Sequence, residues 1–570
     1  MKTYRRFFLT ALLLLGLGLM LCACSGEGTP DETGDTGDSV IGEGSAEDPA
    51  GSISAITVCG VDYTDTVLDE GDIKRWANEN DLDNEACSMP GIIVSPYFTM
   101  TANGVDIPVF AERTANGPHN LAYIEVDGVG EDGVFSLNVE LEAHTARKDP
   151  VVLPESSGVT AVSDGKKTTA RITSFGSYTF TFDKGLLNDG SALPLTVMVK
   201  PKELSEYKNY KTREIEPGTY PLGELDLSTP GSLYYFKKGV YEIDCINIAT
   251  GNIIVYFEPG TLLVAKPLTL DENGTPMAQH VIAGWGQFGV KILGHAAVDL
   301  SYRPRTGVIF SFDKMSLLEF GGLNVINSNN WTCCFTGCED VVIRDLALIG
   351  YKTYSDGVML SDCKNVTVDG CFVRTGDDAL EVKSTSDGSV RAENVLFQNN
   401  AVWTDKGIAY GCVYESNFSQ SGVTWKNNSV GYALANWSQH LGCATISING
   451  ADPTVEDHDM HFEDLEIYYS RCPVITLVMH NGGSIHDIHF KNITAKEVKL
   501  NSAVSKSYID IWIKNEDGGA LTDFVLDNLF FDNISYNGTV LNTDNADDEI
   551  RFSVPKDYPI DRSILHINTK

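Results

Sequence analysis

Short apolar segments of β type recur through the C-terminal part of the chain, and this recurrence constrains the fold more than any other feature. Each segment has a polar residue, alternating Val, Ile or Leu, then Asn or Asp, then a second apolar run. The spacing is roughly 22 to 30 residues, a period typical of solenoid repeats. Clear instances are 340–346, 365–368, 394–397, 422–425, 460–465, 487–493 and 524–529.

A single repeat of this kind cannot bury its apolar face, so successive repeats must stack as coils. Strands of neighbouring coils then lie about 4.8 Å apart, and residues at equivalent positions lie one above another. Asn and Asp at the recurring corner could form a hydrogen-bonded ladder. The sequence therefore predicts an all-β chain whose residues 206–570 form a parallel β-solenoid.

The preceding region, residues 53–205, has a different pattern. Runs such as 120–126, 135–141 and 177–182 alternate apolar and polar residues with period two, which predicts half-buried strands. Their density between turns is typical of a β-sandwich. We find no acid/base or metal constellation in this region, so we expect a smaller β-sandwich-like domain that packs or contacts carbohydrate.

The first 52 residues predict export. Residues 1–24 combine Lys2, Arg5 and Arg6 with a long apolar run, as in a signal peptide. The run ends at Leu21-Cys22-Ala23-Cys24, which looks like a bacterial lipobox with Cys24 as the lipidated residue. Residues 25–52 contain no Lys or Arg and suit a disordered acidic linker. We expect an extracellular, membrane-anchored bacterial lipoprotein, held by its lipid alone.

The charge and the cysteines limit the partners. A net charge of −36 argues against nucleic acid, and it suits a neutral sugar better than a polyanion. The 13 cysteines show no framework spacing, so most of them are interpreted as small buried residues, with Cys363 and Cys371 as the pair to examine for a bridge. Paired histidines at 458/461 and 486/489 fall on strands where residues three apart face opposite ways, so we expect no metal there. We also expect no cofactor, and we expect a monomer.

Three aspartates form the candidate catalytic group. Asp356 lies in a Ser-Asp-Gly turn, and the pair Asp377-Asp378 begins 21 residues later. Clustered carboxyls can supply both states that glycoside hydrolysis needs, a protonated acid and a carboxylate that activates water. Two other interpretations remain open: Asp before Gly is ordinary turn chemistry, and the pair could be an acidic turn or a calcium site.

Several ordered segments resemble a known family. Residues 294–299, 302–305, 327–331, 355–357 and 375–379 occur in the order seen in the polygalacturonases, glycoside hydrolase family 28. The C-terminal half, with the β-rich region before it and residues 401–403, equally resembles the dextranase and isopullulanase family, glycoside hydrolase family 49. The resemblance implies a right-handed parallel β-helix, Asp377 as general acid, and Asp356 and Asp378 activating water for inversion.

The chain departs from family 28 in its substrate contacts. The family's Gly-His-Gly segment would fall at 405–407, where this chain has Asp405-Lys406-Gly407, and no Arg-Ile-Lys segment follows Gly422. A cation could come from Lys383, Lys406 or Arg374 instead. Four aromatic residues could either stack on sugar rings or pack in the core: Trp403, Tyr410, Trp437 and Trp331.

The sequence thus predicts a surface-anchored glycoside hydrolase that acts on a polysaccharide, polygalacturonase-like or dextranase-like. Two alternatives stay open. A β-helix polysaccharide lyase would need calcium and an Arg or Lys base. A non-catalytic glycan-binding adhesin would bind sugar even without Asp377.

Overall fold

The structure is a computed structural model that describes residues 52–55, 91–115, 117–127, 129, 135–183, 193–203, 207, 209–305, 307–350, 352–384, 392–412, 416, 418–435, 444–450, 455–500, 507–515, 520 and 523–569. Residues Asp48–Lys570 form one compact unit. The predicted signal peptide, Cys24 and nearly all of the predicted linker lie outside the described residues. None of the described helices is long and apolar enough to cross a membrane.

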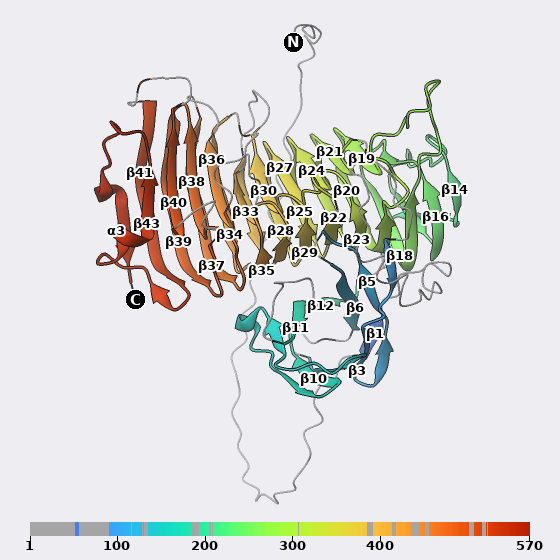
Figure 1. Ribbon diagram of the computed structural model, residues 1–570. Coiled ribbons are helices and arrows are strands. Elements are labelled where there is room, and N and C mark those ends of the chain that lie inside the picture. Colours follow the sequence, from blue (N-terminus) through green and yellow to red (C-terminus); the bar gives the residue numbers. More distant parts are fainter. Residues whose placement is uncertain are drawn as a thin grey trace, which may run out of the picture. The chain divides into compact units, whose positions relative to one another are not determined.

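Two sheets made almost entirely of parallel strands form a β-helix (Figure 1). Within the described residues, the larger sheet has 21 strands: β13 (Lys211–Ile215), β14 (Gly218–Tyr220), β15 (Ser232–Phe236), β16 (Gly239–Ile243), β18 (Ile253–Ala265), β20 (Phe288–Asp299), β22 (Ser316–Gly321), β23 (Leu323–Ser328), β25 (Glu339–Arg344), β26 (Ala347–Gly350), β28 (Lys364–Asp369), β29 (Phe372–Thr375), β31 (Glu393–Gln398), β32 (Ala401–Thr404), β34 (Gln420–Lys426), β35 (Ser429–Ala433), β37 (Glu456–Ile467), β39 (Gly483–Ala495), β41 (Phe524–Tyr536), β42 (Thr539–Val540) and β44 (Leu565–Asn568).

The second sheet of the β-helix carries the candidate site. Among the described residues it has 11 parallel strands: β17 (Ile246–Ile248), β19 (Ile282–Trp285), β21 (Phe310–Asp313), β24 (Cys333–Thr336), β27 (Val358–Ser361), β30 (Leu380–Lys383), β33 (Tyr410–Cys412), β36 (Ile446–Gly450), β38 (Ile475–His480), β40 (Ile509–Lys514) and β43 (Ile550–Ser553). A short helix, α3 (Ala546–Glu549), precedes β43.

The predicted repeats stack in register, which confirms the parallel β-helix. The seven segments identified from sequence lie in β25, β28, β31, β34, β37, β39 and β41, and each pairs in parallel with the next. One column of inward side chains runs through them. Its central rings stack, with Trp425 5.4 Å from Phe397 and 4.5 Å from Phe462 between ring centroids. Stacked equivalent residues give the continuous core that one coil could not form alone.

The expected corner ladder is present. Asn365 Nδ2 donates to Asp340 Oδ1 at 2.9 Å, and Asn394 Nδ2 donates to Asn365 Oδ1 at 2.9 Å. All three residues have φ of 54–57°, in the left-handed region. Asn and Asp tolerate this region better than other residues with a side chain. The left-handed conformation of the turn therefore favours Asn or Asp, and the side chains of these residues form the hydrogen bonds of the ladder.

The N-terminal strands form two mostly antiparallel sheets. One contains β1 (Ser52–Ala55), β2 (Ile92–Val94), β5 (Val109–Glu112), β6 (His119–Asp127), β8 (Val151–Leu153), β11 (Gly176–Thr181) and β12 (Leu195–Pro201). The other contains β3 (Phe98–Ala102), β4 (Val105–Ile107), β7 (Leu137–Ala143), β9 (Ala161–Asp164) and β10 (Lys167–Ile172). We call these strands the N-terminal sandwich.

Two of the three predicted strands differ from the expectation of half-burial, because residues 177–181 of β11 are all buried and β6 is nearly so. β7 alternates buried and exposed residues as predicted, but eight of the nine residues of β6 are buried. The second face of its sheet is covered because Leu121 and Tyr123 of β6 pack with Phe372 and Trp403 of the β-helix. A period-two pattern cannot reveal a second packing partner, so this burial could not be predicted from the sequence.

The cysteines and histidines behave as structural residues. Cys363 and Cys371 are both buried free thiols, so the structure forms no bridge between them. The histidine pairs stack between neighbouring coils, with ring centroids 5.0 Å apart for His458 and His486 and 4.5 Å for His461 and His489. These contacts continue the side-chain columns of the β-helix.

Glu112, on β5, gives a prediction for stability. It is fully buried and accepts a hydrogen bond from Asn324 Nδ2 of β23 at 2.8 Å. Burial raises the pKa of this carboxyl from 4.5 to about 8, with a smaller contribution from Asp299. As pH rises above 4.5, the unfolded chain loses this proton while the folded protein keeps it, so stability falls until about pH 8. We expect Glu112→Gln to remove this loss, about 3 kcal/mol at pH 7.

For a chain of this size the gain corresponds to a rise of about 3 °C in the thermal midpoint at pH 7. Scanning calorimetry at pH 5 and pH 7.5 measures it, with Glu140→Gln, at an exposed position of β7, as the matched control. Equal midpoint shifts at the two pH values would contradict the assignment.

Candidate active site

The candidate aspartates lie in turns directly before two paired strands. Asp356 precedes β27, and Asp377-Asp378 precede β30. These strands pair in parallel with Val358 opposite Leu380. The same register continues into the turns, where the Gly357 N–H donates to the Asp378 carbonyl oxygen at 2.8 Å. Asp356 and Asp378 therefore occupy equivalent positions on neighbouring coils. Asp377 and Asp378 lie before β30 begins, so the alternation of side chains between the two faces of a strand does not apply to them.

A fourth carboxylate and a lysine join them. Glu381 and Lys383 are two apart on β30, so they share one face of the strand. Lys383 Nζ lies 3.3 Å from Glu381 Oε1 and 3.6 Å from Asp356 Oδ2. It also lies 4.3 Å from the ring centroid of Trp331, which precedes β24, two coils earlier. Lys383 is thus a buried cation shared between two buried carboxylates.

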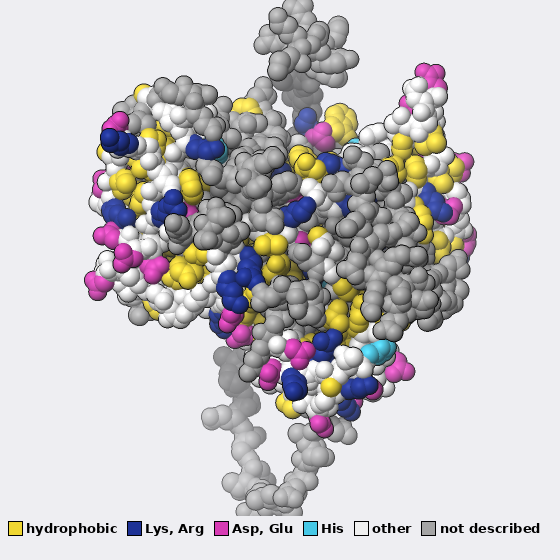
Figure 2. All heavy atoms as spheres, in the orientation of Figure 1, with side chains coloured by type: hydrophobic (Ala, Val, Ile, Leu, Met, Phe, Trp, Pro, Cys, Tyr) yellow, Lys and Arg dark blue, Asp and Glu magenta, His cyan; other side chains and the backbone are white. Residues whose placement is uncertain are grey.

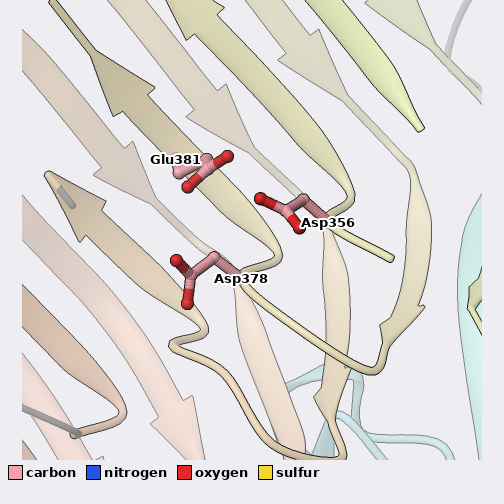
Figure 3. A group of neighbouring side chains, drawn as sticks. All are labelled: Asp356, Asp378 and Glu381. Atoms are coloured by element: carbon pink, nitrogen blue, oxygen red, sulfur yellow. The ribbon is translucent and has the colours of Figure 1, made fainter. Parts of the chain in front are cut away.

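The three carboxylates around this lysine converge (Figure 3). One oxygen from each of Asp356, Asp378 and Glu381 lies within 4.8 Å of the others. Such a group could hold a hard cation, because Ca²⁺ prefers carboxylate oxygens. Lys383 already brings a positive charge to the same place. The arrangement can also orient a water molecule between two carboxylates.

Backbone contacts fix the turn that carries the aspartate pair. The Ile408 N–H donates to Asp378 Oδ1 at 2.8 Å, which fixes the direction of the carboxylate. Thr375 Oγ1 donates to the Asp377 carbonyl oxygen at 2.6 Å, and the Gly376 N–H donates to Ser355 Oγ at 2.9 Å. Asp377 is 9% exposed. The turn is therefore held from the coils on both sides.

Cationic and aromatic side chains lie beside the turns. Lys406 Nζ donates to Thr353 Oγ1 at 2.6 Å, three residues before Asp356. Tyr354 is 40% exposed and has φ 67°, which is unusual for a bulky residue. The Arg305 guanidinium lies 4.0 Å from its ring centroid. Lys406, Tyr354 and Arg305 are thus placed where a bound sugar chain could reach them.

The aromatic predictions need correction. Trp403 is 1% exposed and packs against the N-terminal sandwich. Tyr410 is fully buried in the core of the β-helix, because it pairs with inward-facing Leu380. Neither ring has a face available to a sugar. Trp437 lies outside the described residues. Arg374 is also buried and paired with Asp405, so it is not a substrate cation.

Sequence reasoning missed Glu381, Tyr354 and Arg305. Glu381 had a readable signal, since Glu381 and Lys383 alternate with Leu380 and Val382 and must share the outward face of a strand. Tyr354 and Arg305 had none, because the contact joins residues from different coils.

Part of the chain matches a known family of glycoside hydrolases. Residues 273–475 match the family model described as glycosyl hydrolases family 28. No curated protein matches. The β-helix resembles a family 28 exopolygalacturonase from Yersinia enterocolitica, with 12% identity, a TM-score of 0.39, and 76% of this chain and 96% of that chain covered.

Two further structures are similar at the same level. The hyperthermoactive exopolygalacturonase from Thermotoga maritima has 16% identity and a TM-score of 0.36, covering 54% of this chain and 85% of that chain. The catalytic domain of a GH87 α-1,3-glucanase has 8% identity and a TM-score of 0.38, covering 85% and 89%.

The family match and the fold define the class of the protein. It is a parallel β-helix glycoside hydrolase, an enzyme that cleaves polysaccharide. The matched family 28 region includes Asp356, Asp377 and Asp378.

Proposed function

We propose that the enzyme hydrolyses a glycosidic bond with inversion, using Asp377 as general acid and Asp356 with Asp378 to hold and deprotonate water. The observation that carries the proposal is the register of β27 and β30, which sets Asp356 and Asp378 on neighbouring coils beside Asp377. Hydrolysis needs an acid at the leaving oxygen and a base at the water. The turn supplies carboxyls for both tasks.

The close spacing of Asp356, Asp378 and Glu381 does not conflict with inversion. In inverting enzymes the acid and the base are about 6.5–9.5 Å apart, which leaves room for water. The 4.8 Å limit applies to Asp356, Asp378 and Glu381, the groups that would surround the water. It does not describe their separation from Asp377, the proposed acid.

The charge of the site favours a neutral sugar at the cleaved bond. Lys383 is shared between Asp356 and Glu381, so its charge is already neutralised. With Asp378 beside them, the group carries an excess of negative charge that would repel a uronate carboxylate. On the face drawn in Figure 2, basic and acidic side chains of the described residues are interspersed. We therefore place a neutral, dextran-like polymer first.

Polygalacturonate is the second candidate, and a specific observation favours it. Arg305 and Lys406 lie beside the catalytic turns, where they could bind the carboxylate of a neighbouring sugar unit. The match to the family 28 model agrees with this alternative.

We also propose that the enzyme acts outside the cell as a monomeric lipoprotein. The support is the signal-like segment of residues 1–24, the lipobox-like sequence ending at Cys24 and the acidic stretch after it. Lipid anchoring would hold the enzyme at a membrane face without spanning it.

The test is reducing-sugar release from dextran, pullulan, polygalacturonate and rhamnogalacturonan, with the product anomer followed by NMR. We expect release from a neutral polymer and an inverted first product. Retention of the anomer would reject the assignment of Asp356 and Asp378. Release from polygalacturonate alone would favour the second candidate.

Two results would move the function to another class. Products that absorb in the ultraviolet and depend on calcium would indicate a lyase. Polymer binding without release, unchanged by Asp377→Asn, would indicate a glycan-binding adhesin.

A further inference from the structure

A buried ion pair lies behind the catalytic turn, where the β-helix meets the N-terminal sandwich. Arg374 of β29 binds Asp405 through two hydrogen bonds, Nε to Oδ2 at 3.2 Å and Nη2 to Oδ1 at 3.1 Å. Their side chains are 1% and 0% exposed. A bidentate pair of this kind fixes both partners in direction as well as in distance.

The two partners of the ion pair lie just before the segments that form the candidate site. Arg374 is three residues before Asp377 in one segment. Asp405 is three residues before Ile408, whose N–H binds the Asp378 carboxylate. The Asp405 N–H also donates to the Thr375 carbonyl oxygen at 2.8 Å. The ion pair therefore links the segment 374–378, which carries Asp377 and Asp378, to the segment 405–408, which binds the Asp378 carboxylate.

The N-terminal sandwich contributes the remaining acceptor. Nδ1 of His119, on β6, lies 3.0 Å from Arg374 Nη1. A guanidinium only donates hydrogen bonds, so Nδ1 must accept, and the ring hydrogen is on Nε2. Nε2 then donates to Thr196 Oγ1 at 2.8 Å. Thr196 Oγ1 lies 2.7 Å from Thr179 Oγ1 and can donate its own hydrogen bond to that oxygen.

His119 is fully buried and lies beside two aromatic rings. Its ring lies 4.8 Å from the ring of Phe372 and 5.4 Å from that of Trp403, between centroids. Burial, with the Arg374 charge beside it, lowers the pKa of His119 well below 6.5. The neutral ring is the form that can accept from Arg374. Hydrogen bonds in such a place are strong, and losing one partner is costly.

We propose that the N-terminal sandwich is a positioning part of the catalytic machinery, with His119 holding the Arg374–Asp405 pair and through it the turn of Asp377 and Asp378. The inference rests on the proposed function for its catalytic consequence. It assigns the sandwich a task beyond packing or sugar contact, because the chain of contacts runs from its interior to the catalytic turn.

Two substitutions separate the hydrogen bond from the rest of the side chain. Asn places its oxygen near the position of Nδ1, so His119→Asn keeps the acceptor for Arg374. Gln reaches the position of Nε2, so His119→Gln keeps the Thr196 contact and loses the acceptor. We expect His119→Gln to lower kcat about 10-fold with little change in KM, since small displacements of catalytic groups have large effects. We expect His119→Asn to retain at least half of the wild-type kcat.

A second measurement tests the inference without any activity. Hydrogen exchange at the amides of Asp405 and Ile408 should be about 10-fold faster in His119→Gln than in wild type or His119→Asn. If no polymer is hydrolysed, this result still supports the positioning role while the proposed function fails. His144→Gln, at an exposed position of the sandwich, is the matched control.

Equal kcat and equal exchange in the Asn and Gln variants would overturn the inference, as would an effect confined to KM. If His119→Gln does not fold, Thr196→Val replaces it, because that change removes the acceptor that orients Nε2. The expected drop in kcat is then about threefold, and an unchanged kcat would overturn the inference as well.

Discussion

Replacing Asp377 with Asn is expected to lower kcat by about 10³-fold, the scale of general acid catalysis. Asn has the same shape and leaves the carbonyl contact with Thr375 Oγ1 intact. It cannot protonate a leaving oxygen, so the loss is chemical rather than structural. Initial rates on the preferred polymer and a thermal midpoint within about 2 °C of wild type are the measurements.

The leaving group distinguishes the acid from the other two aspartates. A substrate with an activated aryl leaving group needs little proton assistance, so it should restore much of the rate in Asp377→Asn. It should not restore Asp356→Asn or Asp378→Asn, which lose the contacts to water. Asp340→Asn, in β25 and in the ladder of Asn and Asp side chains, is the control and should retain wild-type activity. Full activity of Asp377→Asn would refute its role as acid.

Replacing Gly407 with Ala is expected to lower kcat at least about 10²-fold, since an error of about 1 Å at a catalytic group can cost that much. A Cβ at this position would lie 2.2 Å from Asp377 C and 2.4 Å from Asp378 N. Both atoms belong to the backbone of the catalytic turn and cannot rotate away. The turn itself must move, and the two aspartates move with it.

A second glycine provides the control for this prediction. A Cβ on Gly450, in β36, would lie 3.6 Å from Asp457 Oδ2, an ordinary contact. Gly450→Ala should therefore keep wild-type kcat. Rates and midpoints of both variants are compared on the same polymer. A kcat within twofold of wild type in Gly407→Ala would show that the turn tolerates the displacement.

Much of the site could be predicted because its chemistry is local in sequence. Asp356, Asp377 and Asp378 stand in turns, and the repeat length alone places such turns on neighbouring coils. The face shared by Glu381 and Lys383 could also have been read from the period-two alternation of β30, although Glu381 was missed. The sequence did not show that Lys383 would be shared between Asp356 and Glu381, because that depends on the distance between coils.

The aromatic residues show where sequence reasoning is insufficient. Trp403 and Tyr410 have the right side chains for sugar stacking, but one faces the sandwich and the other faces the core. Trp331 instead lies against Lys383. An aromatic residue has the same composition signal on either face of a strand, and only the packed structure fixes which face is outside.

The sequence by itself determined the all-β class, the stacked coils, the Asn and Asp corners and the three aspartates. Each of these follows from period, turn chemistry or spacing, which are properties of neighbouring residues. Only the tertiary structure decided that β6 is buried on both faces and that His119 meets Arg374, because these contacts join residues 255 apart in the chain. Packing across that distance depends on shape and burial, which no local pattern encodes.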